Sequence, residues 1–102
     1  AINDRYPVTP GHLLVIPKRY VASYFDLVSS ELKACNELLH EARSAIRSTD
    51  STVTGFNIGI NDGYAAGQTI FHCHIHLIPR RDGDMEQPQG GVRGVISARQ
   101  HY

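Results

Sequence analysis

Apolar residues follow helical spacing in one segment of the chain. Between residues 29 and 48 they recur every three or four positions, which is typical of a helix with one buried face. We expect Ser29 or Ser30 to cap this long helix, with Glu31 in its first turn. Residues 18–27 mix polar and aromatic side chains, and a short helix is expected there.

Three other segments have the composition of strands. Residues 12–16 form a short β-branched run that a proline ends, and residues 53–60 form a second run interrupted by two glycines. Residues 70–78 alternate polar and apolar side chains up to Pro79, as in a strand with one buried face. The Asn-Asp-Gly turn signal at 61–63 predicts that the last two strands form a hairpin.

The order strand, helix, strand, strand in 102 residues predicts a single α+β domain with a mainly antiparallel sheet, one long helix and one short helix. Residues 4–11 contain two prolines and are expected to form a turn or irregular segment. Residues 80–102 are expected to form an irregular tail over the surface. Because the chain begins at Ala1 and opens almost directly on the turn, we expect an N-terminal segment to precede it.

Charge and cysteine content narrow the function classes. Ten basic residues balance ten acidic ones without a basic run, so no nucleic acid is expected as a partner. Arg80 and Arg81 either steer a small anionic ligand or belong to a solvated turn. Cys35 and Cys73 are expected in the core, and their usage indicates a reducing, cytoplasmic compartment. Neither a membrane span nor a secretory signal is expected.

Three of the six histidines, His72, His74 and His76, stand at alternate positions. On a strand, alternate side chains share a face, and successive histidines would lie roughly 6.5–7 Å apart. On a helix the same residues would be scattered, with about 200° between neighbouring members. The pattern therefore predicts a strand with one imidazole-lined face. The other face would be apolar and suited to a core: Phe71, Cys73, Ile75 and Leu77.

Several imidazoles on one face suit chemistry at phosphorus. Imidazole can act as nucleophile, general acid or general base near neutral pH. A ring nitrogen can attack phosphorus to form a phospho-histidine that water later cleaves, while neighbouring imidazoles orient it and donate hydrogen bonds. Gln68 and Thr69 lie just upstream and are candidate donors to the same phosphate, and Gly67 permits close approach of the backbone.

The run His-Cys-His-Ile-His-Leu-Ile at residues 72–78 resembles the H-φ-H-φ-H-φ-φ signature of the histidine triad family, in which φ is apolar. Residues 7–17, 56–61 and 67–69 resemble three further segments of that family in order and spacing. The matching segments cover most of the chain from Asp4 to Arg80. The resemblance implies a histidine triad domain whose sheet continues across a homodimer.

The resemblance also implies a role for individual positions. His74 would be the nucleophile, His76 would lie against the reacting phosphate and supply the leaving-group proton, and His72 would hold the site's hydrogen-bond geometry. The substrate would be a purine nucleotide derivative, a nucleoside phosphoramidate or a dinucleoside polyphosphate, cleaved at the α-phosphate through a nucleotidyl-histidine. The implied substrate-binding residues are His12 beside the cluster, Asp4 at the ribose, and Asn61, Gln68 and Thr69 at the phosphates.

Two other functions remain open. Some relatives hold structural zinc through an N-terminal C-x-x-C, which this chain lacks, and Tyr20 stands where relatives commonly have His. We therefore expect neither a metal nor another cofactor. A metal-dependent enzyme that uses the histidines of residues 72–76, completed by His12 or Asp4, is one alternative. A non-catalytic nucleotide-binding module is the other. Asp4 and Asn61 can equally serve only as turn residues.

Overall fold

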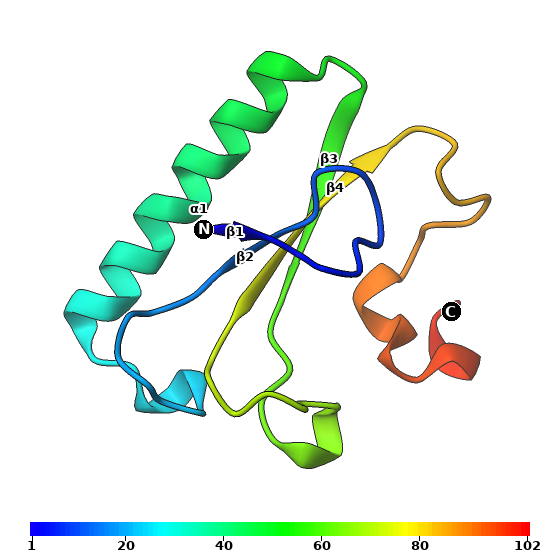
Figure 1. Ribbon diagram of the computed structural model, residues 1–102. Coiled ribbons are helices and arrows are strands. Elements are labelled where there is room, and N and C mark those ends of the chain that lie inside the picture. Colours follow the sequence, from blue (N-terminus) through cyan, green and yellow to red (C-terminus); the bar gives the residue numbers. More distant parts are fainter.

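The computed structural model describes residues 1–102 and places one long helix against one face of an antiparallel sheet (Figure 1). The sheet order is β1-β2-β4-β3, so β4 lies between β2 and β3. This arrangement confirms the predicted α+β class. The elements are β1 (Ile2–Asn3), β2 (Leu13–Val15), α1 (Ser29–Thr49), β3 (Val53–Gly59) and β4 (Ile75–Arg81), with short 3₁₀-helices η1 (Tyr24–Asp26), η2 (Tyr64–Ala66), η3 (Gly91–Val95) and η4 (Ser97–Arg99).

Helix α1 spans the predicted segment but is capped differently. Val28 is the residue at its N-cap, so the prediction of a Ser29 or Ser30 cap was wrong. The Glu31 carboxylate accepts a hydrogen bond from the Val28 backbone N–H at 2.9 Å. The same carboxylate pairs with Arg19 at 2.8 Å, which ties the preceding loop to the helix. An acidic side chain one turn into the helix can thus satisfy a backbone donor without a polar N-cap.

The core lies between α1 and the sheet and confirms the predicted burial of both cysteines. Val15 of β2, Ile75 of β4 and Cys35 of α1 form one buried cluster. Cys73 is 1% exposed and packs against two buried residues of the segment before α1. Burial raises the pKa of both thiols, so neither is a reactive thiolate near neutral pH.

Strand β4 begins later and ends later than the sequence predicts. The prediction placed a strand at 70–78 that Pro79 closes, whereas β4 runs through Pro79 to Arg81. Strand β2 begins at Leu13, opposite Leu77, so Pro79 has a ladder partner on the β3 side only. Proline has no backbone N–H, so it is tolerated where one edge of a strand needs no ladder hydrogen bond.

Residues 70–74 form an irregular segment instead of the first half of that strand. Phe71, which the alternation predicts in the core, is 44% exposed. Burial still alternates from His72 to Leu77, with the histidines half-buried and the intervening residues buried. The alternation in the sequence therefore predicts correctly which side chains are buried and which are half-buried. It places the start of strand β4 too early.

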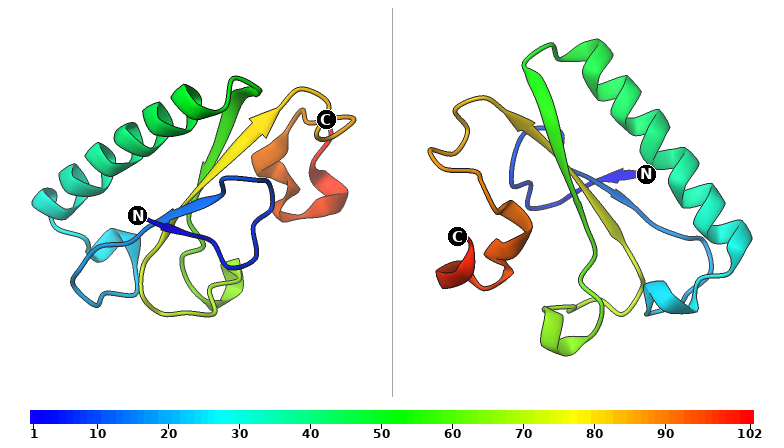
Figure 2. Two further views of the ribbon diagram at one scale, coloured as in Figure 1. Left: turned by 45° about the horizontal axis from the view of Figure 1, so that its top comes forward. Right: turned by 180° about the vertical axis from the view of Figure 1, so that it is seen from behind.

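The predicted hairpin of β3 and β4 exists, but a long connection that contains η2 joins its strands. Gly67 ends η2 with a φ of 90°, in the left-handed region that favours glycine. The tail after β4 lies on the side of the sheet opposite α1, where η3 contacts β3 (Figure 2). None of the helices combines the length and the apolar character needed to cross a membrane.

Candidate active site

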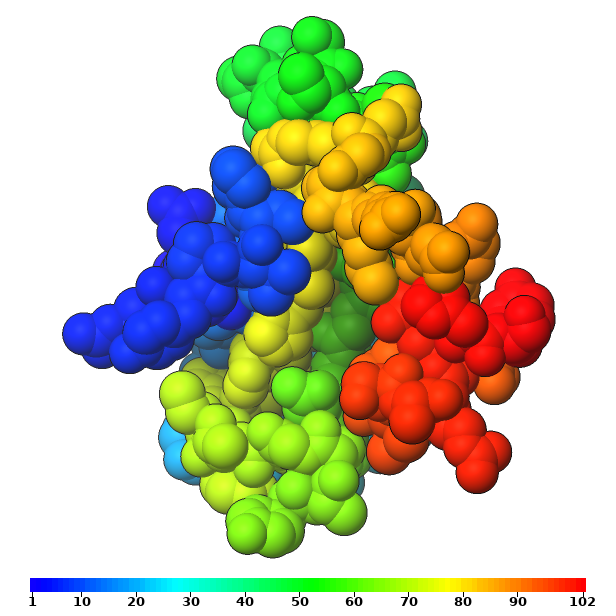
Figure 3. Space-filling model, turned by 90° about the vertical axis from the view of Figure 1, so that its right-hand side faces the viewer, coloured from blue at the N-terminus to red at the C-terminus, as the bar shows by residue number.

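The sheet face opposite α1 carries the candidate chemistry. Leu14, His76 and Gly59 pair in register across β2, β4 and β3, and paired residues of an antiparallel sheet point to the same side. Gly59 has no side chain, which leaves His76 open toward β3. Figure 3 shows this face between the N-terminal residues in blue and the tail in red, with the yellow β4 running through the hollow.

His12 is 3% exposed and uses both ring nitrogens. The backbone N–H of Val8 donates to Nδ1 at 3.0 Å, so this nitrogen carries no proton. The proton of neutral His12 is therefore on Nε2, which lies 2.9 Å from His76 Nδ1 and donates to it. Neutral His76 must then carry its own proton on Nε2. The Val8 backbone thus sets the tautomers of two histidines in series.

The surroundings of His76 keep its imidazole neutral. Burial is the main cause that lowers the pKa of His76 from 6.5, and the nearby His12 and His74 act in the same direction. Asp4 opposes the shift, with its Oδ2 atom 3.7 Å from His76 Nδ1. At pH 7, His76 is consequently a neutral ring that offers an N–H donor at Nε2.

His74 has the opposite tautomer. Its Nδ1 lies 2.8 Å from the backbone carbonyl oxygen of His72, which can only accept, so Nδ1 carries the proton. The lone pair of neutral His74 is therefore on Nε2. The rings of His74 and His76 meet edge to face, with centroids 5.3 Å apart. A free imidazole lone pair next to an N–H donor is an arrangement that can attack a phosphorus centre.

The side chain of His72 has partners other than this pair. Its Nε2 donates to the backbone carbonyl oxygen of Pro17 at 2.8 Å, and its ring packs 5.0 Å from that of Tyr20. Of the three triad histidines only His76 lies in a strand, because His72 and His74 belong to the irregular segment before β4. His72 contributes its backbone carbonyl to His74, while its side chain fixes the irregular segment to the loop after β2.

Asp4 lies beside the His12–His76 pair and also shapes the turn. Its Oδ2 atom is 3.4 Å from His12 Nε2, and its Oδ1 atom accepts the backbone N–H of Tyr6 at 2.8 Å. Asp4 therefore serves as a turn residue, which is one of the two roles that the sequence leaves open. Its carboxylate also faces the histidine cluster, and ribose binding by Asp4 stays a prediction.

Asp4, His12 and His76 also form a group that could hold a metal ion, because their ligand atoms lie within 4.8 Å of one another. Two nitrogen ligands of tetrahedral zinc would lie roughly 3.3 Å apart, given bond lengths of about 2.0–2.1 Å. The observed 2.9 Å between His12 Nε2 and His76 Nδ1 is the distance of a hydrogen bond. The two rings thus share a proton in this geometry. His72 and His74, which the metal alternative used, are not in this group.

Gln68, a predicted phosphate contact, is 3% exposed and bonded at both ends of its amide. Its Oε1 atom accepts the Gly63 backbone N–H at 2.8 Å. Its Nε2 atom donates to the carbonyl oxygens of Ala22 and Ile70 at 2.9 and 3.2 Å. The side chain therefore holds together the loop before the triad. Thr69, the next residue, is exposed and free of such contacts.

Two contacts near the site have no signal in the sequence. One is the backbone N–H of Val8, whose effect on His12 depends only on the path of the chain. The other is Asp62, which accepts hydrogen bonds from the Tyr24 backbone at 2.8 Å and from the Ser23 hydroxyl at 3.2 Å. Asp62 joins the β3–β4 connection to η1, whereas the sequence indicates only a turn residue.

Arg80 and Arg81 bind carboxylates of this chain. Arg80 pairs with Asp84 at 2.7 Å, and Arg81 pairs with Asp50 at 2.8 Å. Arg80 also donates to the side-chain oxygen of Asn57 at 2.7 Å. These contacts favour the structural interpretation of the two arginines over a steering function, because their charges are compensated.

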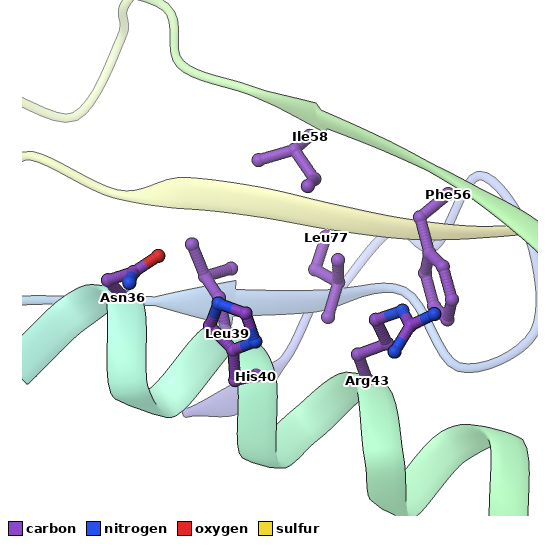
Figure 4. Close-up of a pocket in the computed structure, with 7 residues that line it drawn as sticks. All are labelled: Asn36, Leu39, His40, Arg43, Phe56, Ile58 and Leu77. Carbon is purple, nitrogen blue, oxygen red and sulfur yellow. The ribbon is translucent and has the colours of Figure 1, made fainter.

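A pocket lies on each side of the sheet, and one of these adjoins the histidines. A pocket of ≈410 Å³ lies on the open face, where His12, His76 and Asn61 share its lining with the tail. A pocket of ≈320 Å³ lies on the other side, between α1 and β3 (Figure 4). No triad histidine lines the second pocket, so the candidate chemistry belongs to the open face. The second pocket is lined by Asn36, Leu39, His40, Arg43, Phe56, Ile58 and Leu77.

The domain is α+β, and hydrogen-bonded imidazoles lie on the open face of its sheet. These two features place it in a class of proteins built around a histidine cluster. Residues 1–83 match the family model described as the HIT domain. The chain therefore belongs to the histidine triad, or HIT, family.

Three similar proteins show how far the likeness extends. The chain is 42% identical over 81 residues to bis(5'-nucleosyl)-tetraphosphatase (asymmetrical) of Schizosaccharomyces pombe, which covers 79% of this chain and 44% of that protein. The crystal structure of a Zn-bound histidine triad family protein from Mycobacterium smegmatis superposes with a TM-score of 0.74 at 39% identity, over 83% of this chain and 61% of that one. The structure of diadenosine triphosphate hydrolase from Plasmodium falciparum superposes with a TM-score of 0.68 at 37% identity, over 82% of this chain and 56% of that one. This chain thus spans about half the length of such relatives.

Proposed function

We propose that this protein hydrolyses purine nucleotide derivatives at the α-phosphate through a nucleotidyl-histidine on His74. The observation that carries the proposal is the hydrogen bond from His74 Nδ1 to the His72 carbonyl oxygen, which leaves the Nε2 lone pair free. Membership of the HIT family supports the substrate class. The names of two relatives, a bis(5'-nucleosyl)-tetraphosphatase and a diadenosine triphosphate hydrolase, support it further.

In the first step, His74 Nε2 attacks the α-phosphorus and forms a P–N bond. The bond from phosphorus to the leaving group breaks, and its electron pair departs with that group. His76 donates a hydrogen bond from Nε2 to the departing atom, which lowers the cost of the charge developing there. Because His76 is neutral near pH 7, a leaving group that must be protonated takes its proton from solvent.

In the second step, water attacks the phosphorus and the P–N bond breaks. The electron pair returns to His74 Nε2, the water's proton passes to solvent, and a nucleoside monophosphate is released. The carbonyl of His72 accepts from the same Nδ1–H throughout the cycle, so it orients the ring and stabilises the positive charge that the ring carries in the intermediate.

The remaining site residues are assigned supporting roles in this proposal. Asp4 and His12 fix the orientation and tautomer of His76, and Asp4 binds the ribose. Asn61 and Thr69 contact the phosphates, since Asn61 lines the pocket next to His76 and Thr69 is exposed at the loop. Gln68 positions these donors through the loop that it holds.

The test is AMP release from adenosine 5'-phosphoramidate and from a diadenosine polyphosphate, each with and without EDTA. We expect AMP from the wild-type protein, at a rate that the chelator does not change. An acid-labile, base-stable AMP adduct should be trapped during turnover, as expected for a phospho-histidine. Nucleotide binding without AMP would favour the binding-module alternative, and a loss of activity with EDTA would favour the metal-dependent one.

We further propose that the protein is a cytoplasmic homodimer whose two sheets join along β3. Strand β3 is at the edge of the sheet, so its outer backbone groups have no ladder partner. Ile58 is 55% exposed there, next to the apolar pocket against α1 (Figure 4). Light scattering should give twice the mass of one chain, and Ile58→Asp should give the mass of one. A monomeric wild-type protein would contradict the proposal.

A further inference from the structure

The loop between β1 and β2 places the backbone N–H of Val8 against His12, although residues 4–12 contain neither a helix nor a strand. The Val8 side chain is 70% exposed, so its own packing does not fix the position of this N–H. The contact of 3.0 Å from Val8 to His12 Nδ1 therefore depends on what attaches the loop to the sheet.

Thr9 makes a hydrogen bond that attaches this loop to β4. Its hydroxyl donates to the backbone carbonyl oxygen of Pro79 at 2.6 Å. Pro79 is fully buried, and β2 begins at Leu13, opposite Leu77, so the strand ladder does not reach Pro79 on this side. A buried carbonyl oxygen without a donor is costly. The Thr9 hydroxyl thus supplies the donor that a longer β2 would have offered.

Two further contacts bring the same loop against the end of β4. Gly11 has a φ of 90°, and a Cβ atom there would lie 3.3 Å from a ring carbon of Pro79, so the chain passes β4 closely at this point. Arg81 donates to the carbonyl oxygen of Pro10 at 2.9 Å. These contacts hold the second half of the loop, whereas Thr9 attaches the first half. Loss of the Thr9 hydroxyl should therefore loosen the first half while the second half stays on the sheet.

The Val8 N–H decides where the protons of the two linked histidines lie. With this donor against Nδ1, His12 carries its proton on Nε2 and donates to His76, whose own proton is then on Nε2. Without this donor, His12 can carry its proton on Nδ1, and the bond between the rings can reverse, with His76 donating from Nδ1. His76 would then offer a lone pair at Nε2 in place of an N–H.

We propose that Thr9 is a positioning residue: its bond to Pro79 holds the Val8 N–H in place and so keeps His76 in the tautomer that presents Nε2–H. The effect on turnover rests on the proposed function, in which His76 donates to the departing atom. The effect on the tautomers does not rest on it, because both bonds exist in the protein without substrate.

Nitrogen-15 NMR of the histidine rings tests the inference without substrate, because protonated and unprotonated ring nitrogens have well-separated chemical shifts. Near neutral pH, the protonated nitrogen of the wild-type protein should be Nε2 in both His12 and His76. Thr9→Val nearly keeps the shape of threonine but removes the donor, and it should add a second set of ring signals with Nδ1 protonated. Thr9→Ser keeps a hydroxyl and should restore the wild-type signals.

Turnover gives a second readout. Thr9→Val should lower kcat for AMP release by about tenfold and change KM less than about twofold, because the donor at His76 is less firmly oriented and is present in only part of the molecules. Thr9→Ser should recover kcat to within about twofold of the wild type. Thr54→Val is the matched control, because it removes a hydroxyl bond to Asp82 near the start of β3, whereas Gly59, which pairs with His76, ends that strand. It should leave the ring signals and kcat unchanged.

Three results would overturn the inference: wild-type ring signals in Thr9→Val, wild-type kcat and KM in Thr9→Val, or a loss in Thr9→Ser as large as that in Thr9→Val. The proposed function fails separately. If the wild-type protein releases no AMP while Thr9→Val still changes the ring signals, the hydrolase function is wrong and the positioning by Thr9 stands.

Discussion

Replacing His74 with alanine is expected to lower kcat for AMP release by at least about 10³-fold, because no other group near the phosphate would offer a free imidazole lone pair. Nucleotide binding should persist, since the His12–His76 pair and the loop donors do not depend on the His74 ring. The fold should also persist. His74 is half-buried, and its side chain makes a single hydrogen bond to a local backbone carbonyl.

The measurement is steady-state AMP release alongside a thermal unfolding curve for each variant. His101→Ala serves as the matched control, because His101 is an exposed histidine whose ring makes a single hydrogen bond, to the Gln87 carbonyl oxygen. It should match the wild type in both measurements. A His74→Ala protein that retains activity within tenfold of the wild type would show that another group is the nucleophile.

The tautomers that support this prediction could not be derived from the sequence. The spacing of His72, His74 and His76 indicates imidazoles in one region, and the structure confirms that His74 and His76 are adjacent. Which nitrogen carries each proton depends on backbone partners, the Val8 N–H and the His72 carbonyl oxygen. Any residue type at position 8 except proline would offer the same N–H, so no composition or periodicity signals it.

The fold class was predictable because burial alternates with the period of each element. Cys35 and Val15 are buried as the helical and strand patterns predict. The error at residues 70–74 has a physical cause: an alternating sequence does not by itself fix the backbone, which bends at residues 70–72 instead of continuing the strand. Phe71 lies in this bend and is exposed. Strand pairing depends on the position of β2, which local sequence does not specify.

The substitution Gln68→Leu is expected to lower the free energy of unfolding by about 2–4 kcal/mol, because it leaves the half-buried backbone N–H of Gly63 and two carbonyl oxygens without their partner. Leucine has a similar volume, so lost hydrogen bonding and not a cavity should dominate. For a domain of this size the melting temperature should fall by roughly 10–20 °C. Activity should fall as well, through loss of the loop that positions Asn61 and Thr69.

Thr69→Val is the matched control for this loop, because Thr69 is exposed and its hydroxyl has no partner within the protein. It should keep the melting temperature of the wild type and raise KM, as expected for a lost phosphate contact. If Gln68→Leu instead melts like the wild type and only raises KM, the Gln68 amide would be free to contact the phosphate, as the sequence alone predicts. The pair of variants thus separates a residue that builds the site from one that contacts the substrate.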